Sequence, residues 1–194
     1  PMWLAVGSPA TFEKAGHYGL GALGFGLMFS SGEQVRRYVD IYREAQRHAE
    51  PVGHYVNDNF LVAQTVVCLE DPKDAREALL AAQPGYMLSL LHRYHDTIPR
   101  PEDGPIWPEL FPEPGMADVE QMVRSGAAIG SPEEVVAALR AYEAAGVDQI
   151  VLGLPMGLPH DVAMEIVRVI GEKVMPRFDT DPEHRSSRMR YGGA

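Results

Sequence analysis

The turn at residues 7–11 carries the groups best suited to bind an anion. Its sequence is Gly7-Ser8-Pro9-Ala10-Thr11, and it joins an expected buried strand to an expected helix. A helix N-terminus presents free backbone N–H groups and the positive end of the helix dipole. Ser8 and Thr11 add hydroxyl groups, and Gly7 lets the backbone come close to a ligand. Two interpretations follow: a phosphate site, or an ordinary N-cap in which Ser8 serves only its own helix.

A second candidate is the glycine-rich loop at residues 24–32, which follows the next expected strand. Phe25, Met28 and Phe29 in this loop could line an apolar substrate pocket, or they could belong to the core of a simple connector. His160 follows the last expected strand and is a weaker candidate for substrate contact.

The remaining polar residues point to no metal site and no nucleophile. His92 and His95 are three residues apart, but no nearby carboxylate motif supports a metal, so surface positions are expected. Cys68 lies inside an apolar run and is expected to be buried and inert. The segment 57–59 precedes a strand and is assigned no catalytic role. No catalytic residue can be named.

Strands and helices are expected to alternate along the chain. Buried strands are expected at 2–6, 22–25, 60–69 and 147–154, and helices at 9–18, 33–49, 73–82 (or resuming to residue 95), 117–125, 132–146 and 161–175. Apolar strands separated by helices are typical of a parallel sheet covered by helices. The choices are a doubly wound sheet or a (β/α)8 barrel. A whole barrel needs about 250 residues, so four strand–helix units predict an open sheet or half a barrel.

Composition limits the partners and the compartment. The 194 residues have a formal net charge of −10, which argues against nucleic acid as a partner. No apolar run is long enough to cross a membrane. A single cysteine excludes an internal disulfide framework and fits a reducing compartment, so we expect a cytoplasmic protein.

The chain divides into one domain, residues 1–178, and a polar tail, residues 179–194. A proline-rich insertion at about 97–116 interrupts the domain and is either a lid or a plain insertion. The first residues enter a strand directly after Pro1. We therefore expect the C-terminal part of a longer chain.

Several segments, in this order, resemble the bacterial luciferase-like monooxygenase family. They are residues 3–11, 15–21, 69–75, 129–135, 142–148 and 174–178. The resemblance extends over about residues 2–178. Each segment alone is weakly specific, and the ordered set is what identifies the family.

The resemblance implies that the four strands are the fifth to eighth of a flavin-binding (β/α)8 barrel. It implies phosphate contacts at Gly7, Ser8 and Thr11, and catalytic groups lying mostly in the four absent strands. Members of the family use reduced FMN or the deazaflavin F420, usually without a metal. With the resemblance, the phosphate site becomes the favoured interpretation of residues 7–11.

Three functional hypotheses follow. The first is a flavin-dependent monooxygenase that uses reduced FMN, supplied by a reductase, and O2 on a small organic substrate, or a related F420-dependent oxidoreductase. The second is a non-catalytic half-barrel that assembles with another copy, as a homo-oligomer, or with an N-terminal half. The third is an unrelated doubly wound domain that still binds a phosphate.

Overall fold

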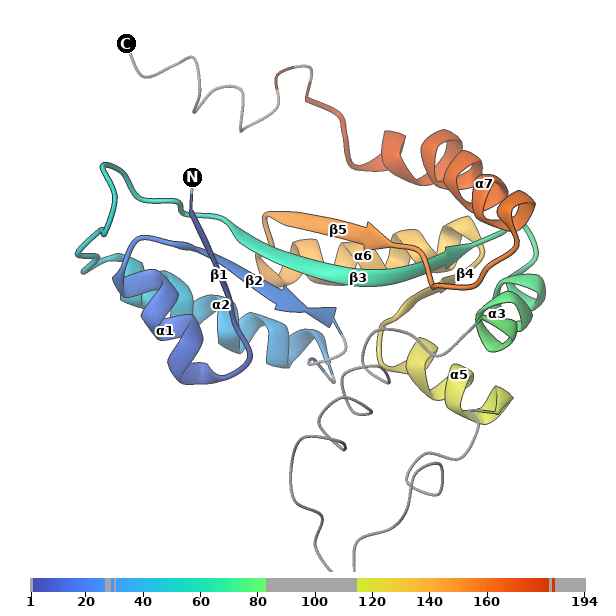
Figure 1. The fold of residues 1–194 in the computed structure, drawn as a ribbon, viewed down its shortest axis with the longest axis horizontal. Coiled ribbons are helices and arrows are strands. Elements are labelled where there is room, and N and C mark those ends of the chain that lie inside the picture. Colours follow the sequence, from blue (N-terminus) through green and yellow to red (C-terminus); the bar gives the residue numbers. More distant parts are fainter. Residues whose placement is uncertain (1, 27–28, 30, 83–114, 182, 184–194) are drawn as a thin grey trace, which may run out of the picture.

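A computed structural model describes residues 2–26, 29, 31–82, 115–181 and 183 (Figure 1). Several predictions lie outside the described residues: the pocket residue Met28, the surface positions of His92 and His95, the resumption of a helix to residue 95, and most of the proline-rich insertion. Most of the polar tail does too. The fold below therefore concerns the two parts of the chain on either side of the insertion.

The centre of the fold is a parallel sheet. Its strands are β1 (Trp3–Ala5), β2 (Gly21–Phe25), β3 (Phe60–Cys68), β4 (Ala128–Gly130) and β5 (Gln149–Gly153). The long β3 pairs with β2 on one side and with β5 on the other, and Figure 1 shows it as the central strand. The expected four strands are confirmed in parallel order. The short β4, which pairs with the last three residues of β3, is an addition.

The helices connect successive strands. They are α1 (Pro9–His17), α2 (Gly32–Gln46), α3 (Pro72–Ala81), α5 (Met116–Arg124), α6 (Pro132–Ala145) and α7 (His160–Val169). The last helix continues as a π-helical turn, Ile170–Val174, and a 3-10 turn, Met175–Arg177. Local sequence explains the boundaries of α6: Ser131 and Glu134 form a reciprocal capping box, and Gly146 ends the helix at φ +94°.

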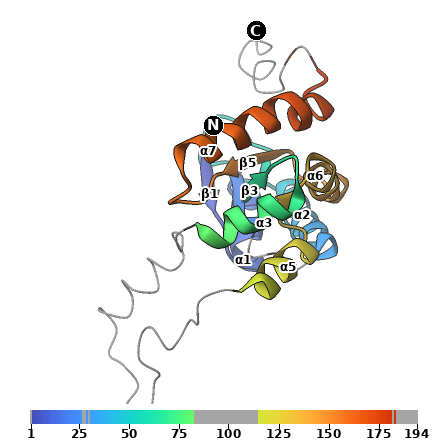
Figure 2. The same ribbon diagram turned by 90° about the vertical axis from the view of Figure 1, so that its right-hand side faces the viewer.

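Two apolar clusters hold the helices against one face of the sheet. In the first, the ring of Phe12 stacks on Phe60 at 5.2 Å and on Tyr38 at 4.8 Å between centroids. The second joins the end of β3 to β4, α6 and α7, and includes Ile129 and Ile166, both fully buried. Figure 2 shows the helices grouped around the strands in the perpendicular view.

The other face of the sheet has few residues packed against it. A row across three strands places Phe25 beside Ala63 and Ala63 beside Val151. Phe25 is 40% exposed and Val151 is 52% exposed, although both are large apolar residues. In a closed barrel, side chains on this face fill the interior. The described residues thus leave an apolar sheet face uncovered.

The strands' N-terminal ends are tied together by polar groups. The Tyr42 hydroxyl lies 2.9–3.1 Å from the carbonyl oxygens of Leu20, Asn57 and Asn59, and burial raises its pKa. The Asn57 side chain donates to the Met2 carbonyl at 2.9 Å. These groups are structural, and they lie away from the carboxyl ends of the strands, where barrel active sites form. No helix in the described ranges is both long and apolar enough to cross a bilayer.

Candidate functional site

The turn after β1 places Gly7, Ser8 and Thr11 together at the N-terminus of α1. The Thr11 hydroxyl accepts the N–H groups of Gly7, at 3.0 Å, and Ser8, at 2.9 Å. It donates in turn to the Ser8 carbonyl at 2.8 Å. Thr11 therefore folds the turn back on the helix, which is the role that sequence reasoning gave to Ser8.

One backbone N–H at this helix end is free for a ligand, and a partly exposed hydroxyl lies beside it. The N–H of Ala10 is in the first helical turn and has no intrahelical acceptor. The Ser8 hydroxyl is partly exposed and lies 3.3 Å from the Thr11 hydroxyl. Because the Thr11 proton goes to the Ser8 carbonyl, Ser8 is the donor of this long contact and would exchange it for a ligand. The first turn of α1 contains no acidic side chain, whereas α2 and α6 carry Glu33 and Glu133 at the same place. This helix end is thus suited to an anion electrostatically.

The loop after β2 divides its aromatic residues between two environments. Phe25 stands on the uncovered sheet face, 40% exposed. Phe29 is 4% exposed and packs near Phe12 and Tyr38, with ring centroids 6.5 and 5.8 Å away. Phe29 therefore belongs to the aromatic core, the alternative considered from the sequence, and it also borders a small cavity. Phe25 is the pocket candidate that the structure leaves open to a ligand.

Gly26 occupies a position that a side chain could not. A Cβ built at Gly26 would come within 1.6 Å of the Oε1 of Gln64, whose side chain is only 7% exposed. Glycine thus lets the backbone after β2 pack directly against the Gln64 side chain of β3. Close packing therefore requires glycine at residue 26, but not at Gly32, where a Cβ meets no atom within 4 Å.

His160 and Cys68 are the remaining candidates from the sequence. His160 is the exposed first residue of α7, after β5, and no hydrogen bond or ion pair joins it to the other candidates in the described part of the chain. Cys68 is buried, and desolvation raises the pKa of its thiol to about 11. Such a thiol is a poor nucleophile at neutral pH. Across the described ranges, no three His, Cys, Asp or Glu side chains gather as a metal site would require.

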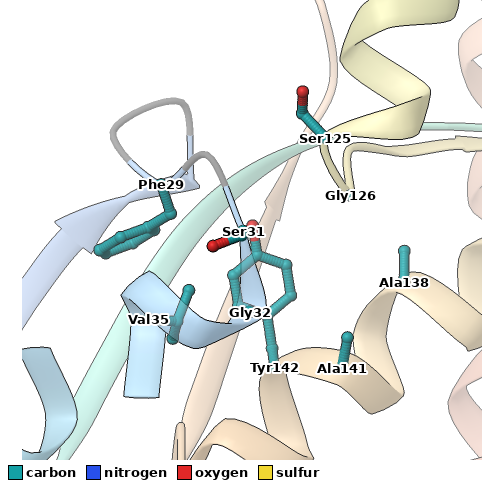
Figure 3. A pocket seen from close by; sticks show the side chains of 9 residues that line it. All are labelled: Phe29, Ser31, Gly32, Val35, Ser125, Gly126, Ala138, Ala141 and Tyr142. Atoms are coloured by element: carbon teal, nitrogen blue, oxygen red, sulfur yellow. The ribbon is translucent and has the colours of Figure 1, made fainter. Parts of the chain in front are cut away.

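A cavity of about 30 Å³ lies between the start of α2, the end of α5 and the side of α6 (Figure 3). Its walls are formed by Phe29, Ser31, Gly32, Val35, Ser125, Gly126, Ala138, Ala141 and Tyr142. Sequence reasoning missed this cavity because it placed Tyr142 only on the apolar face of a helix. Nothing in the local sequence shows that α2 and α6 meet there.

One family model and a set of solved structures match the chain. The family model described as luciferase-like monooxygenase matches residues 1–149. Searching the curated proteins gave no match. Among solved structures, monooxygenase RslO1 from Streptomyces bottropensis is 20% identical with a TM-score of 0.63; the alignment covers 92% of this chain and 48% of that one.

Two further structures show the same fold with different cofactors in their names. The coenzyme F420 dependent tetrahydromethanopterin reductase from Methanopyrus kandleri is 19% identical, with a TM-score of 0.59 over 92% of this chain and 51% of that one. The oxygenating constituent of 3,6-diketocamphane monooxygenase from Pseudomonas putida, in complex with FMN, is 18% identical, with a TM-score of 0.53. The alignment covers 89% of this chain and 47% of that one. The chain spans about half the length of these structures.

Proposed function

The chain belongs to the luciferase-like monooxygenase family, and from this we propose that it forms part of a flavin-dependent oxidoreductase. Its parallel strands and helices are the fold of about half of a (β/α)8 barrel. We favour reduced FMN as the cofactor and a monooxygenase reaction on a small organic substrate, with F420 as the alternative. The main support for this proposal is the family match, together with the turn after β1 that presents hydrogen-bond donors.

The residues at this turn fit the phosphate end of such a cofactor. The Ala10 N–H and the Ser8 hydroxyl are the donors that a phosphate oxygen would accept from, and Thr11 holds the turn in place by its three hydrogen bonds. The helix dipole of α1 adds a favourable potential without an opposing carboxylate in its first turn. Gly7 is exposed, so its backbone is open to a ligand.

The uncovered sheet face provides the apolar wall of the proposed pocket. Phe25, the last residue of β2, and Val151, in the middle of β5, would line the barrel interior. A flavin supplies the electron transfer that protein side chains cannot perform, and the protein supplies binding, orientation and exclusion of water. Reduced FMN would reach the site from a separate reductase. The one buried cysteine is compatible with a reducing, cytoplasmic location.

Calorimetric titration of the intact protein with FMN and with F420 tests this proposal. We expect Ser8→Ala to weaken binding of the favoured flavin about tenfold, because one hydrogen bond to a charged phosphate is lost. Ser131→Ala is the matched control: it removes a helix-capping serine from α6, outside the proposed site. Equal affinities for wild type and Ser8→Ala would contradict the phosphate site, and binding of neither flavin would contradict the flavin function.

A second function rests on the open sheet. With β1 and β5 at its two edges, the path β1–β2–β3–β5 contains half of the eight strands that a barrel needs. We propose that either another copy or an N-terminal half pairs with these edges and covers Phe25 and Val151. Light scattering is the test. A stable, flavin-free monomer would argue against both the assembly and independent catalysis.

A further inference from the structure

Thr65 places a hydroxyl group on the uncovered face of the sheet. Side chains alternate between the two faces of a strand, so Ala63 and Thr65 point to the same face of β3. Gln64 and Val66 point to the opposite face and are buried, whereas Thr65 is exposed. The Thr65 hydroxyl therefore lies on the same face as the apolar row that contains Ala63.

The strand register places Thr65 where the neighbouring strands end. β2 ends at Phe25, which pairs with Ala63, two residues before Thr65. β5 ends at Gly153, which pairs with Thr65 itself, and Figure 1 shows β5 running alongside β3. Barrel active sites form at the carboxyl ends of the strands. Thr65 is thus a polar residue at the end of the sheet where a ligand would bind.

Gly153, the partner of Thr65, leaves open space on this face. Its φ is not positive, so the backbone conformation does not require glycine. Among the described residues, a Cβ built there would meet only the carbonyl oxygen of Gln64, at 3.9 Å, which is an ordinary contact. A glycine inside a strand weakens it, and often marks a place where a ligand comes close to the backbone. Gly153 therefore points, independently of Thr65, to a ligand on the uncovered face.

The distance between Thr65 and the turn after β1 limits the shape of that ligand. The turn follows β1, which pairs with β2, and β2 pairs with β3. Neighbouring strands lie about 4.8 Å apart, so Thr65 on β3 lies roughly 10 Å from the strand that leads into the turn. A ligand that reaches both places must hold its anionic group well away from its other polar groups. FMN and F420 have this shape, because a sugar-alcohol chain separates the phosphate from a flat ring.

We infer that Thr65 and Gly153 bind the polar edge of the flavin ring, an assignment that rests on the flavin function proposed above. The ring is apolar at one end and carries carbonyl and N–H groups at its pyrimidine end. The apolar end lies on Phe25 and Val151, and the Thr65 hydroxyl donates to a ring carbonyl or accepts from a ring N–H. Gly153, which has no side chain, lets the ring come close to β5.

Fluorescence titration of the intact protein with two forms of the cofactor that wild type binds tests the inference. One form carries the phosphate; the other lacks it, and is riboflavin for FMN or the deazaflavin with its ribityl chain alone for F420. Thr65→Val keeps the shape of the side chain and removes the hydroxyl, so it should weaken both forms by the same factor, about fivefold. Thr65→Ser keeps the hydroxyl and should bind close to wild type. Ser8→Ala should weaken only the form with the phosphate.

Gly153→Ala separates a ligand contact from a structural role. Its methyl group takes up the space beside Thr65, so both forms of the cofactor should bind more weakly. The melting temperature of the ligand-free protein should stay unchanged or rise, because alanine restricts the unfolded chain more than glycine does. Thr180→Val is the matched control: it makes the same exchange at an exposed threonine beyond the last helical turn, and should leave both affinities unchanged.

The outcomes distinguish this inference from the function on which it rests. Wild type that binds neither FMN nor F420 overturns the flavin function and the ring contact together. Where wild type binds one of them, the ring contact alone is overturned if Thr65→Val or Gly153→Ala binds both forms as tightly as wild type. It is also overturned if Thr65→Ser loses as much affinity as Thr65→Val, or if the loss in Thr65→Val is confined to the form with the phosphate.

Discussion

Arg43 on α2 and Asp148 before β5 form an ion pair with 2.5 Å between Nη2 and Oδ2. The same Oδ2 accepts the N–H of Phe60, at 2.7 Å, and Arg43 also donates to the carbonyl of Asp58. One carboxylate therefore joins a helix, the start of β3 and the start of β5. Its side chain is only 14% exposed, so little water competes for these bonds.

Asp148→Ala should lower the free energy of unfolding by about 2–4 kcal/mol, because it removes the anionic partner of a partly buried guanidinium and the acceptor of the Phe60 N–H. Chemical denaturation measures the change. Glu44→Ala is the control: it breaks an ion pair with Arg47 in which both side chains are more than 60% exposed. It should cost at most about 1 kcal/mol. Equal losses of unfolding free energy in the two variants would show that the Asp148 contacts stabilise the fold no more than an exposed ion pair does.

Thr11 should matter for stability as well as for ligand binding. Thr11→Ala removes the acceptor of the Gly7 and Ser8 N–H groups and should cost about 1–2 kcal/mol. Thr11→Ser keeps the hydroxyl and should retain most of that stability. Thermal unfolding followed by circular dichroism compares them. A Thr11→Ser variant as unstable as Thr11→Ala would mean that the methyl group, and not the hydroxyl, stabilises the turn.

Gly16 and Gly171 make a matched pair of glycine substitutions. A Cβ at Gly16 would lie 2.5 Å from the carbonyl oxygen of Tyr42 and 2.8 Å from the Cβ of Ala45, so α1 and α2 would have to separate. We expect Gly16→Ala to cost about 1–3 kcal/mol. At Gly171 a Cβ meets nothing within 4 Å, and Gly171→Ala should be neutral or stabilising by up to about 1 kcal/mol. Urea denaturation of both variants decides the point.

Glu134 should contribute to acid sensitivity. Its carboxylate accepts from Arg76, at 2.9 Å, and from the Ser131 N–H, at 2.8 Å, and these bonds lower its pKa, Arg76 most of all. A lowered pKa in the folded state adds stability that is complete above the unfolded value of about 4.3 and is lost as the pH falls through the folded value.

Unfolding free energies between pH 7 and pH 3 test this effect. Arg76→Gln should lower stability at pH 7 and lessen the further loss on acidification. Arg168→Gln alters an ion pair with Glu165 on the exposed side of α7 and should leave the acid profile close to that of wild type. An Arg76→Gln profile parallel to that of wild type would exclude Glu134 as a source of acid sensitivity.

Local patterns were sufficient to predict most of the fold. β3 has apolar side chains on both faces, and the helix after Ser131 begins with a cap, a proline and two acids. Each pattern fixes structure over a few residues. The short β4 was missed because three residues, Ala128–Gly130, carry too little periodicity to predict a strand. The end of the last helix was placed correctly, but its change to π and 3-10 geometry has no local signal.

The candidate site was less predictable because it depends on contacts between distant segments. The sequence predicts that a hydroxyl group caps the backbone of the 7–11 turn. Whether Ser8 or Thr11 does so depends on how the turn folds, and in the structure it is Thr11. Phe25 and Phe29 are four residues apart, and the sequence does not distinguish them. Packing against distant residues buries Phe29 and leaves Phe25 exposed. The residues that line the cavity beside Tyr142 come from α2, α5 and α6, and no spacing in the sequence brings them together.

The neighbours of β3 have a consequence for how the chain folds as it is synthesised. The strand pairs with β2 soon after it leaves the ribosome, but its opposite edge waits for β5, since Leu61 pairs with Gln149. Until Gly153 has emerged, the nascent chain carries an apolar strand with an unpaired edge. Contacts between residues so far apart in sequence also slow folding. During that interval the half-made protein is at its most vulnerable to misassembly and is a natural client for chaperones.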